Sequence, residues 1–257
     1  MKPSPELQAA LDAAAAAAEI ARALYRRNLD VRLKEDKSPV TEADWRCEVA
    51  IREILAARFP GHGFLGEETG GSETGAESLW LVDPIDGTKA FIREYPMFST
   101  QIALMRAGQI VLGVSSAPVY GELACAERGW GAYLNGERLS VSDVAVIDDA
   151  ALSAGNLRTL ARGDRWSAYG GLVARVARIR GYGDFLHYHL LAAGKIDAVI
   201  ESDVNVLDIA AAVAIVAEAG GRFTDLEGRP ITLASTTVLA TNGRLHDAVL
   251  RALRAEP

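Results

Sequence analysis

Start signals for helices and runs of small apolar residues mark the first sixty residues of the chain. Ser4-Pro5-Glu6 is typical of a helix start, and the alanine-rich stretch behind it predicts a long helix to about Asn28. The residues from Val31 to Lys34 predict a short strand. Thr41-Glu42-Ala43-Asp44 is a second start signal, and it predicts a helix that Pro60-Gly61 ends.

Apolar and polar residues alternate with the period of a strand in the middle of the chain. Three such runs lie between Thr100 and Glu127, separated by Ala107-Gly108 and Tyr120-Gly121. This spacing predicts an antiparallel meander. Asn135-Gly136 then predicts a tight hairpin turn.

The pattern changes near residue 140, where helices begin to alternate with short apolar strands such as Ala198-Val199-Ile200. We therefore expect an N-terminal α+β half, residues 1–140, and a C-terminal α/β half, residues 141–257. No repeat, low-complexity tract or flexible linker separates them, so the halves should pack tightly.

Composition narrows the class of protein. Hydrophobic residues make up 49% of the 257 residues, which is enough for a large core. The net charge of −7, with no Lys/Arg block, argues against a nucleic-acid partner. Asp12 and Glu19 flank the run of alanines, so it is neither a membrane span nor a signal-peptide core. Cys47 and Cys125 have no metal-type spacing and predict reduced, buried thiols of a cytoplasmic protein.

Candidate chemistry gathers in one short segment. Trp80-Leu81-Val82 predicts a strand that runs into Asp83 and stops at Pro84; Asp86 and Gly87-Thr88 follow. Two carboxylates are thereby fixed beside free backbone N–H groups at a predicted helical turn. Hard divalent cations prefer carboxylate oxygens, and phosphate prefers helix N-terminal N–H groups. The segment can hold metal and phosphate side by side, as metal-assisted phosphate-ester chemistry requires.

This segment also carries a family resemblance. Asp83-Pro-Ile-Asp-Gly-Thr88 resembles the signature of the inositol monophosphatase-like phosphatases, which are magnesium-dependent and lithium-sensitive. Gly66-Glu67-Glu68-Thr69 is similar to their Gly-Glu-Glu motif, and residues 206–211 with 218–221 are similar to their C-terminal metal motif. Residues 180–185, Arg-Gly-Tyr-Gly-Asp-Phe, most resemble the histidinol-phosphate phosphatase branch. The resemblance implies a layered αβαβα sandwich of mixed α/β class, with the active site between the two halves.

The resemblance assigns metal ligands for two or three Mg²⁺ ions. They are Glu67, Asp83, Asp86, Asp208 and the backbone carbonyl of Ile85. Four converging carboxylates would repel one another without cations, which agrees with this assignment. Each motif also has a structural alternative: a strand-ending turn at Asp83-Pro84, an exposed loop at Glu67, and a helix cap at Asn205 with Asp208 in the first turn.

The resemblance gives Asp44 and Thr88 catalytic roles together with Glu67. The Asp44 carboxylate pairs with the Thr88 hydroxyl, and the two orient and deprotonate the attacking water. Asp44 is also explained as a helix cap, and both roles can coexist. Asp86, Gly87 and Thr88 are assigned to the phosphate, whereas Lys89 fits either the phosphate field or a solvated surface position.

The resemblance places substrate selection in the C-terminal half. Gly183, Asp184, Glu201 and Asp208 match positions that contact the alcohol part of the substrate. The carboxylate of Asp184 stands where inositol phosphatases often carry small neutral residues, and it would favour a cationic substrate such as histidinol phosphate. Its alternative role is a cap of the helix that follows. His187 and His189 are expected to face solvent or to pack, because Mg²⁺ prefers oxygen.

We therefore expect hydrolysis of L-histidinol phosphate to L-histidinol and phosphate, a step of histidine biosynthesis. Three alternatives stay open: an inositol-1-phosphate phosphatase, a 3′-phosphoadenosine 5′-phosphate phosphatase, and a non-enzymatic metal- or phosphate-binding regulator. The third is disfavoured because binding alone needs no water activator such as the Asp44/Thr88 pair. The partner is a small phosphorylated metabolite, with no membrane, and the resemblance implies a homodimer.

Overall fold

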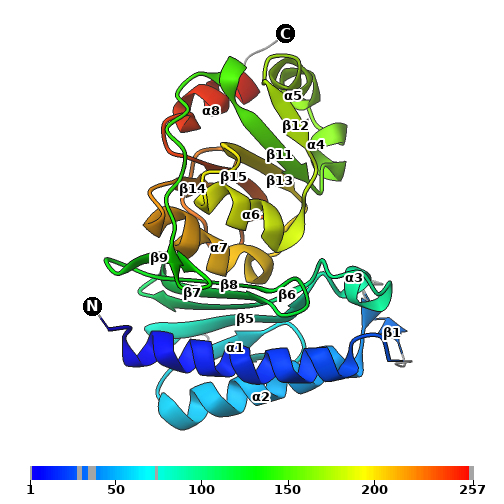
Figure 1. Ribbon diagram of the computed structural model, residues 1–257, viewed down its shortest axis with the longest axis vertical. Coiled ribbons are helices and arrows are strands. Elements are labelled where there is room, and N and C mark those ends of the chain that lie inside the picture. Colours follow the sequence, from blue (N-terminus) through cyan, green and yellow to red (C-terminus); the bar gives the residue numbers. More distant parts are fainter. Residues whose placement is uncertain (1, 28–30, 34–38, 73–74, 255–257) are drawn as a thin grey trace.

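Five layers of secondary structure stack along the long axis of the molecule (Figure 1). The computed structural model describes residues 2–27, 31–33, 39–72 and 75–254. From one end, two helices cover an eight-stranded sheet, two helices separate it from a five-stranded sheet, and three helices cover that second sheet. This is the αβαβα sandwich predicted from the family resemblance.

The first layer consists of α1 (Pro5–Leu24) and α2 (Glu42–Arg58). The Ser4 hydroxyl accepts the N–H of Leu7 at 3.0 Å and caps α1, as predicted. Helix α1 ends at Leu24, earlier than the predicted Asn28, which lies outside the described residues. The Tyr25 backbone leaves the helical conformation and its ring packs 5.6 Å from Phe91 and 5.2 Å from Phe98.

The first sheet contains the predicted meander. Its order is β10-β9-β8-β7-β6-β5-β3-β4, and β5 to β8 pair antiparallel in sequence order. The bounds are β3 (Gly63–Gly66), β4 (Gly70–Ser72), β5 (Ser78–Asp86), β6 (Ser99–Arg106), β7 (Gln109–Ala117), β8 (Glu122–Glu127), β9 (Gly131–Leu134) and β10 (Glu137–Arg138). The predicted Asn135-Gly136 turn joins β9 to β10. A separate pair, β1 (Arg32–Leu33) with β2 (Pro39–Val40), includes part of the predicted strand at residues 31–34; Lys34 lies outside the described residues.

Strand β5 does not stop at Pro84, contrary to the prediction. It continues to Asp86, with a shift of register between Asp83 and Asp86 where it pairs with β6. An irregularity of this kind tolerates a proline inside a sheet, because the missing N–H is not needed for the ladder there. The Thr100 hydroxyl donates to the Pro84 carbonyl at 2.8 Å and holds the irregular segment against β6.

The middle layer is made of α6 (Asp184–Ala192) and α7 (Val206–Glu218). Helix α7 lies very close to the first sheet at Gly113 of β7. A Cβ added to Gly113 would stand 2.4 Å from the carbonyl oxygen of Ala211. Glycine is therefore required for this approach, which sets the position of the first turn of α7 and of Asp208 within it.

The second sheet has the order β12-β11-β13-β15-β14. Its strands are β11 (Ala151–Gly155), β12 (Arg178–Arg180), β13 (Ala198–Ser202), β14 (Arg222–Thr224) and β15 (Thr237–Thr241). The alternation of helices and short strands predicted after residue 140 is confirmed. The last layer consists of α4 (Arg158–Arg162), α5 (Trp166–Val173) and α8 (His246–Arg254), and the short helices α3 (Thr88–Ile92) and η1 (Ile147–Asp149) lie in connections.

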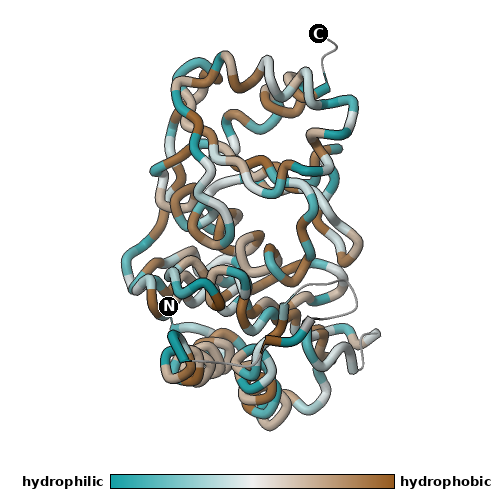
Figure 2. The backbone as a smooth tube through the Cα atoms, turned by 90° about the vertical axis from the view of Figure 1, so that its right-hand side faces the viewer, coloured by the Kyte–Doolittle hydropathy of each residue, from teal (hydrophilic) through white to brown (hydrophobic). Residues whose placement is uncertain are grey.

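Hydrophobic cores fill the spaces between the layers. One core lies between α1, α2 and the first sheet, and a second lies between the outer helices and the second sheet. A third joins the halves, since Leu79 and Tyr188 belong to the same cluster as Ile215 and Val238. Figure 2 shows hydrophobic segments running through the stacked layers. The boundary predicted near residue 140 stays a prediction.

Two further findings bear on the sequence analysis. Within residues 2–27, 31–33, 39–72 and 75–254, no helix is long and apolar enough to cross a membrane. Cys47 and Cys125 are free and buried, as predicted. Burial raises the pKa of the Cys47 thiol to about 12 and that of Cys125 to about 11, so neither has the low pKa of a reactive thiol.

Candidate active site

The irregular end of β5 presents two carboxylates at the edge of the first sheet. Asp83 is 2% exposed, and its Oδ1 accepts the backbone N–H of Ile85 at 3.0 Å. Asp86 follows at the last position of the strand, where Oδ2 accepts the Ser99 hydroxyl at 3.3 Å. The register shift thus brings both side chains to one end of the strand, on either side of Ile85.

Helix α7 brings a third carboxylate from the C-terminal half. Asn205 caps α7, as the structural alternative for this motif had it, and Asp208 completes a capping box: Asn205 Oδ1 accepts the N–H of Leu207 at 3.1 Å and Asp208 Oδ2 accepts the N–H of Asn205 at 3.3 Å. Asp83, Asp86 and Asp208 each offer a carboxylate oxygen within 4.8 Å of the others. Oxygen donors at this spacing fit a hard divalent cation such as Mg²⁺.

Glu67 joins this group from the loop after β3. Its charge contributes to the raised pKa of Asp83, and both side chains line one cavity of about 320 Å³. The structure therefore brings together the four acidic residues that the sequence analysis assigned to metal. The backbone of Ile85 lines the same cavity wall, and its carbonyl accepts the Thr88 hydroxyl at 3.0 Å.

A residue that sequence reasoning missed fixes the Glu67 loop. Glu48 of α2 is fully buried, and its two carboxylate oxygens accept the backbone N–H groups of Glu68 and Thr69, each at 2.7 Å. Gly66 makes room for this carboxylate, because an added Cβ would lie 2.4 Å from it. Glu48 is four residues after Asp44 and next to buried Cys47, so an acid on an apolar helix face was the available signal.

Burial and mutual repulsion shift the pKa values of the cluster upward. Burial, followed by the charges of Glu67 and Asp208, raises the pKa of Asp83 well above its usual range. Burial and the charges of Asp184 and Asp208 do the same to the pKa of Asp86. Burial and the charge of Glu67 raise the pKa of Asp208 from 3.8 to about 7. A bound cation would remove this penalty, because it favours the ionised carboxylates.

We expect the metal-free protein to lose stability as pH rises from about 4 to about 7. In that window folded Asp208 retains a proton that the unfolded chain has released, since the pKa moves from 3.8 to about 7 on folding. The folded state binds more protons, so the free energy of unfolding falls with increasing pH. Melting temperatures in chelator and in Mg²⁺ from pH 5 to pH 8 measure this effect.

The stabilisation by Mg²⁺ should be larger at pH 8 than at pH 5, because the ligands are then ionised. Asp208→Asn serves as the control and should weaken the pH dependence of the metal-free protein. A metal-free melting temperature that rises steadily across this window would contradict the predicted sign.

Asp44 and Thr88 make the contact that the resemblance predicted. The Thr88 hydroxyl lies 3.1 Å from Asp44 Oδ1 as well as 3.0 Å from the Ile85 carbonyl, so its single hydrogen is shared between two acceptors. Asp44 Oδ2 accepts the N–H of Thr41 at 2.8 Å and its hydroxyl at 2.6 Å, which completes the capping box of α2. Burial raises the pKa of Asp44, and the hydrogen bonds from Thr41 and Thr88 partly oppose this shift.

Gly87 and Lys89 lie at the cavity beside Thr88. Gly87 has φ +88°, and an added Cβ would stand 2.6 Å from the Met97 carbonyl, so the left-handed turn needs glycine. Lys89 is exposed and lines the cavity, where it is the single cation among the described lining residues. This placement is compatible with a role in the phosphate field.

Asp184 lies at the mouth of the same cavity. It is the first residue of α6 and adopts a left-handed backbone with φ +47°, which is uncommon outside glycine. Gly183 is the N-cap, and α6 has no side-chain cap, so the helix-cap alternative for Asp184 is wrong. Burial and the charge of Glu201 raise the pKa of Asp184, although its side chain remains open to solvent.

Glu201 is buried, at 4% exposure, and its charge acts on Asp184. Its Oε2 accepts the Tyr188 hydroxyl at 2.5 Å and lies 3.1 Å from His187 Nε2. Burial, followed by the Glu201 charge, raises the pKa of the Tyr188 hydroxyl well above its usual range. Glu201 is not among the side chains that line the cavity, so the direct substrate contact assigned to it stays a prediction.

His187 and His189 are buried and not solvent-facing, which corrects one of the two expectations for them. The other is confirmed, because both pack inside the protein. His187 Nδ1 lies 3.4 Å from the Ser153 hydroxyl, and His189 contacts Phe185 edge to face. Neither belongs to the acidic group.

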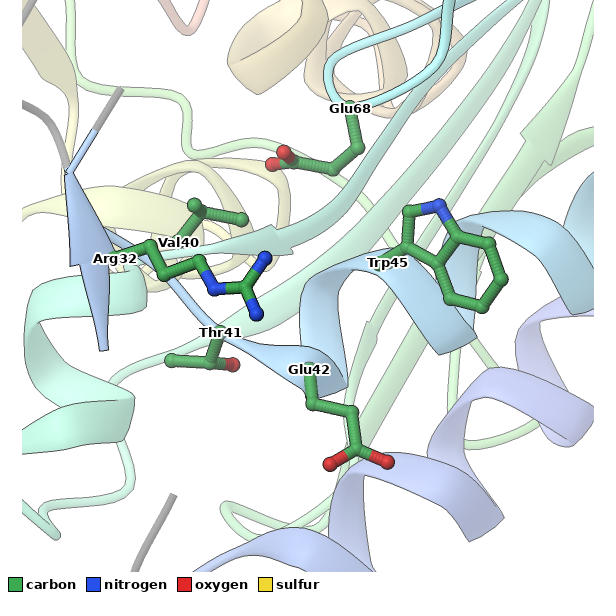
Figure 3. A pocket seen from close by; sticks show the side chains of 6 residues that line it. All are labelled: Arg32, Val40, Thr41, Glu42, Trp45 and Glu68. Carbon is green, nitrogen blue, oxygen red and sulfur yellow. The ribbon is translucent and has the colours of Figure 1, made fainter. Parts of the chain in front are cut away.

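A larger hollow of about 470 Å³ is lined by Val40 and Glu68, the sequence neighbours of Pro39 and Glu67 in the acidic cavity. Figure 3 shows Arg32 pointing into it, with Thr41 and Glu42 on one side and Glu68 and Trp45 on the other. Its described lining mixes charges of both signs. The acidic group that could hold a metal therefore distinguishes the smaller cavity as the candidate active site.

An αβαβα sandwich with this acidic edge defines a class of metal-dependent phosphatases that act on small phosphorylated metabolites. The chain belongs to the inositol monophosphatase family, whose model matches residues 2–257. A histidinol-phosphatase of Mycobacterium tuberculosis is 44% identical over 257 residues. The match covers 97% of this chain and 98% of that protein. An inositol-1-monophosphatase of Mesorhizobium japonicum is 36% identical over 89% of this chain and 87% of its own.

Solved structures agree with this membership. The crystal structure of extragenic suppressor protein suhB from Bartonella henselae has a TM-score of 0.90 at 32% identity, covering 99% of this chain and 100% of its own. The predicted fold and family are confirmed.

Proposed function

We propose that this chain is a Mg²⁺-dependent phosphomonoesterase that hydrolyses L-histidinol phosphate to L-histidinol and phosphate. The observation that carries the substrate assignment is Asp184, whose carboxylate stands at the mouth of the acidic cavity without a capping role. A carboxylate in this place favours the ammonium and imidazole of histidinol phosphate. The similarity to a histidinol-phosphatase at 44% identity supports the same substrate.

The proposed metal ligands are Glu67, Asp83, Asp86, Asp208 and the Ile85 carbonyl, for two or three Mg²⁺ ions. Mg²⁺ held there would lower the pKa of a coordinated water and neutralise charge on the phosphate. The raised pKa values of Asp83, Asp86 and Asp208 support this assignment, since these ionised side chains need cations in order to coexist. Glu48 holds the backbone of the loop that carries Glu67.

The phosphate would lie against the backbone N–H groups of Gly87 and Thr88, with Asp86 beside it. The Thr88 hydroxyl would accept the proton of the attacking water while passing its own hydrogen to Asp44 Oδ1, 3.1 Å away. If the Ile85 carbonyl served as a metal ligand, it would no longer accept the Thr88 hydrogen. Asp44 would then be the acceptor of that hydrogen. The raised pKa of Asp44, caused by burial, supports its role as the final acceptor.

An inositol-1-phosphate phosphatase is the second candidate, because a relative of that name is 36% identical. Asp184 argues against it, since inositol phosphate offers no cation. A 3′-phosphoadenosine 5′-phosphate substrate would place additional negative charge against Asp184 and Glu201, which disfavours it. The homodimer and the cytoplasmic location stay predictions.

Asp184→Asn should raise KM for histidinol phosphate with a smaller effect on kcat, because a contact of equal strength in the ground and transition states contributes mainly to binding. The rise should be about two- to fivefold, since an ion pair open to solvent contributes about 1 kcal/mol or less. Hydrolysis of inositol-1-phosphate should hold steady or improve. Steady-state kinetics of the unmodified protein and of Asp184→Asn on both substrates measures the difference.

Asp164→Asn is a matched control, because it removes one exposed acid that does not line the cavity. Equal losses on both substrates with Asp184→Asn would mean that this carboxylate supports the metal site or the fold. The assignment to histidinol phosphate would then lack its residue-level support, whereas the phosphatase activity itself would stand.

A further inference from the structure

A row of hydrogen-bonded polar side chains runs from Asp86 along the buried face of the first sheet and includes His189 of α6. From Asp86 Oδ2, the successive distances are 3.3, 2.7, 3.1, 2.9 and 2.7 Å. We call this row the buried polar chain; its members are Asp86, Ser99, Gln101, Ser115, His189 and Glu122. The described contacts of the acidic site do not otherwise involve Gln101, Ser115 or His189, so the chain needs a separate explanation.

The far end of the buried polar chain fixes the direction of its hydrogen bonds. The Glu122 carboxylate can only accept, so in the neutral His189 ring the hydrogen is on Nδ1, 2.7 Å from Glu122 Oε2. His189 Nε2 is then an acceptor, and the Ser115 hydroxyl 2.9 Å away donates its hydrogen to it. At the near end, the Ser99 hydroxyl donates to Asp86.

Gln101 lies between the two serines. It shares one face of β6 with Ser99 and stands opposite Ser115 of β7. Because both hydroxyl hydrogens point away from it, the serine oxygens must accept from Gln101, and its Nε2 supplies both N–H groups, at 2.7 and 3.1 Å. Gln101 is 2% exposed, and its Oε1 has no hydrogen-bond partner among the described residues.

The unpaired Oε1 indicates that the groups at the two ends of the buried polar chain hold the Gln101 amide in this orientation. A reversed amide would let Oε1 accept both serine hydroxyls, but Asp86 and His189 would then lose their donors. Burial makes an unpaired carbonyl costly, so the orientation persists only because the groups at both ends demand it. An apolar residue of similar size at position 101 would avoid that cost, which suggests a functional reason for the glutamine.

We propose that Gln101 is a positioning residue for the acidic site. Its two N–H groups turn the Ser99 hydroxyl toward Asp86, and this hydrogen bond fixes the orientation of the carboxylate. Ser115, His189 and Glu122 lock the amide from the other side. The inference rests on the proposed metal function of Asp86. It adds residues that orient this metal ligand through hydrogen bonds without contacting the metal themselves.

The test measures Mn²⁺ affinity by calorimetry in the absence of substrate, with Mn²⁺ as the probe. Loss of a partner that contacts a ligand typically weakens binding by about 10–100-fold, so Ser99→Ala should weaken it by about tenfold, given the 3.3 Å contact. Gln101→Met keeps the side-chain length and removes the amide, and it should raise the Mn²⁺ dissociation constant by about three- to tenfold. Ser116→Ala, which removes a neighbouring buried hydroxyl of β7 outside the chain, should leave it unchanged.

The double variant Ser99→Ala/Gln101→Met distinguishes positioning from a structural role. If Gln101 acts through Ser99, the double variant should bind Mn²⁺ no more weakly than Ser99→Ala alone. Fully additive losses, or an unchanged dissociation constant for Gln101→Met, would overturn the inference. Should Gln101→Met not fold, Ser115→Ala provides the same test from the far side, with a loss of about two- to fivefold expected and an unchanged constant overturning the proposal.

Asp86→Asn separates this inference from the proposed function. If Asp86→Asn abolishes Mn²⁺ binding and Gln101→Met leaves it intact, only the role of Gln101 is wrong. If Asp86→Asn itself binds Mn²⁺ normally, the metal assignment of Asp86 is wrong, and the positioning role is overturned with it.

Discussion

Replacing Asp83 with asparagine should lower kcat/KM for phosphate-ester hydrolysis by at least about 10³-fold, because a catalytic metal supplies several kcal/mol and each tenfold in rate corresponds to about 1.4 kcal/mol. Asp83 is the most deeply buried of the three clustered aspartates and lines the cavity together with Glu67 and Asp208. Its loss would remove a shared ligand and leave the other carboxylates misplaced. Asp208→Asn should have a similar effect.

The same substitution should have the opposite effect on stability. Without metal, burial and the charges of Glu67 and Asp208 make ionised Asp83 unfavourable, as the raised pKa of Asp83 indicates. Asp83→Asn should therefore raise the melting temperature in chelator at pH 8 and reduce the further increase caused by Mg²⁺. Activity and melting curves with and without Mg²⁺ measure both effects.

Full activity of the unmodified protein in excess chelator would exclude metal-dependent chemistry at this cluster. A loss of activity in Asp83→Asn together with a lower metal-free melting temperature would indicate a folding defect. Only the combination of lost turnover and gained metal-free stability matches a ligand that is held against its own repulsion.

Local patterns predicted the elements whose hydrogen bonds are local. The cap at Thr41 and the turn at Asn135-Gly136 formed as expected, and the cap considered as an alternative at Asn205 is present, because cap and turn chemistry depends on neighbouring residues. The predicted end of α1 was wrong, because Tyr25 leaves the helix and contacts aromatic rings from another part of the chain. The extension of β5 past Pro84 likewise depends on pairing with β6.

The acidic site became predictable through motifs and not through periodicity. Spacing suggested that Asp83 and Asp86 lie together, but the addition of Asp208 depends on α7 lying against Gly113, a contact that no local pattern contains. The resemblance supplied that assignment. It did not supply Glu48 or Gln101, which touch backbone and side chains instead of substrate.

Buried polar residues were the signals that sequence reasoning left unused. Ser99 and Gln101 occupy alternate positions at the start of β6, before its apolar run, and Ser115 lies opposite Gln101 in β7. Buried polar groups of this kind need partners, so their alternation predicts a polar row inside a sheet. Its connection to Asp86 and His189 could be seen only once the layers were assembled.

Thr88→Val should lower kcat by about 10²–10⁴-fold, the range expected for the loss of positioned acid–base assistance. Valine is close in size to threonine and removes only the hydroxyl that lies 3.1 Å from Asp44. The metal ligands are untouched, so Mg²⁺ affinity should change little. Single-turnover rates at saturating Mg²⁺ would isolate this effect on the chemical step.

Asp44→Asn should reduce kcat over the same range, about 10²–10⁴-fold, while it largely preserves the fold. Asparagine keeps a side-chain oxygen that can accept the N–H of Thr41, so this half of the capping box should survive and the melting temperature should change little. Asp44→Ala would lose both roles and provides the contrast. If activity followed stability across these two variants, Asp44 would be a cap and nothing more.

The double variant Thr88→Val/Asp44→Asn completes the argument about the water activator. Thr88 can take the proton of water only when Asp44 receives its own, so removing either residue should stop the transfer, and removing both should cost little more. Independent contributions would instead multiply the two losses in kcat. A non-additive result would show that the two residues, 44 positions apart in sequence and joined by one hydrogen bond, act as a single catalytic unit.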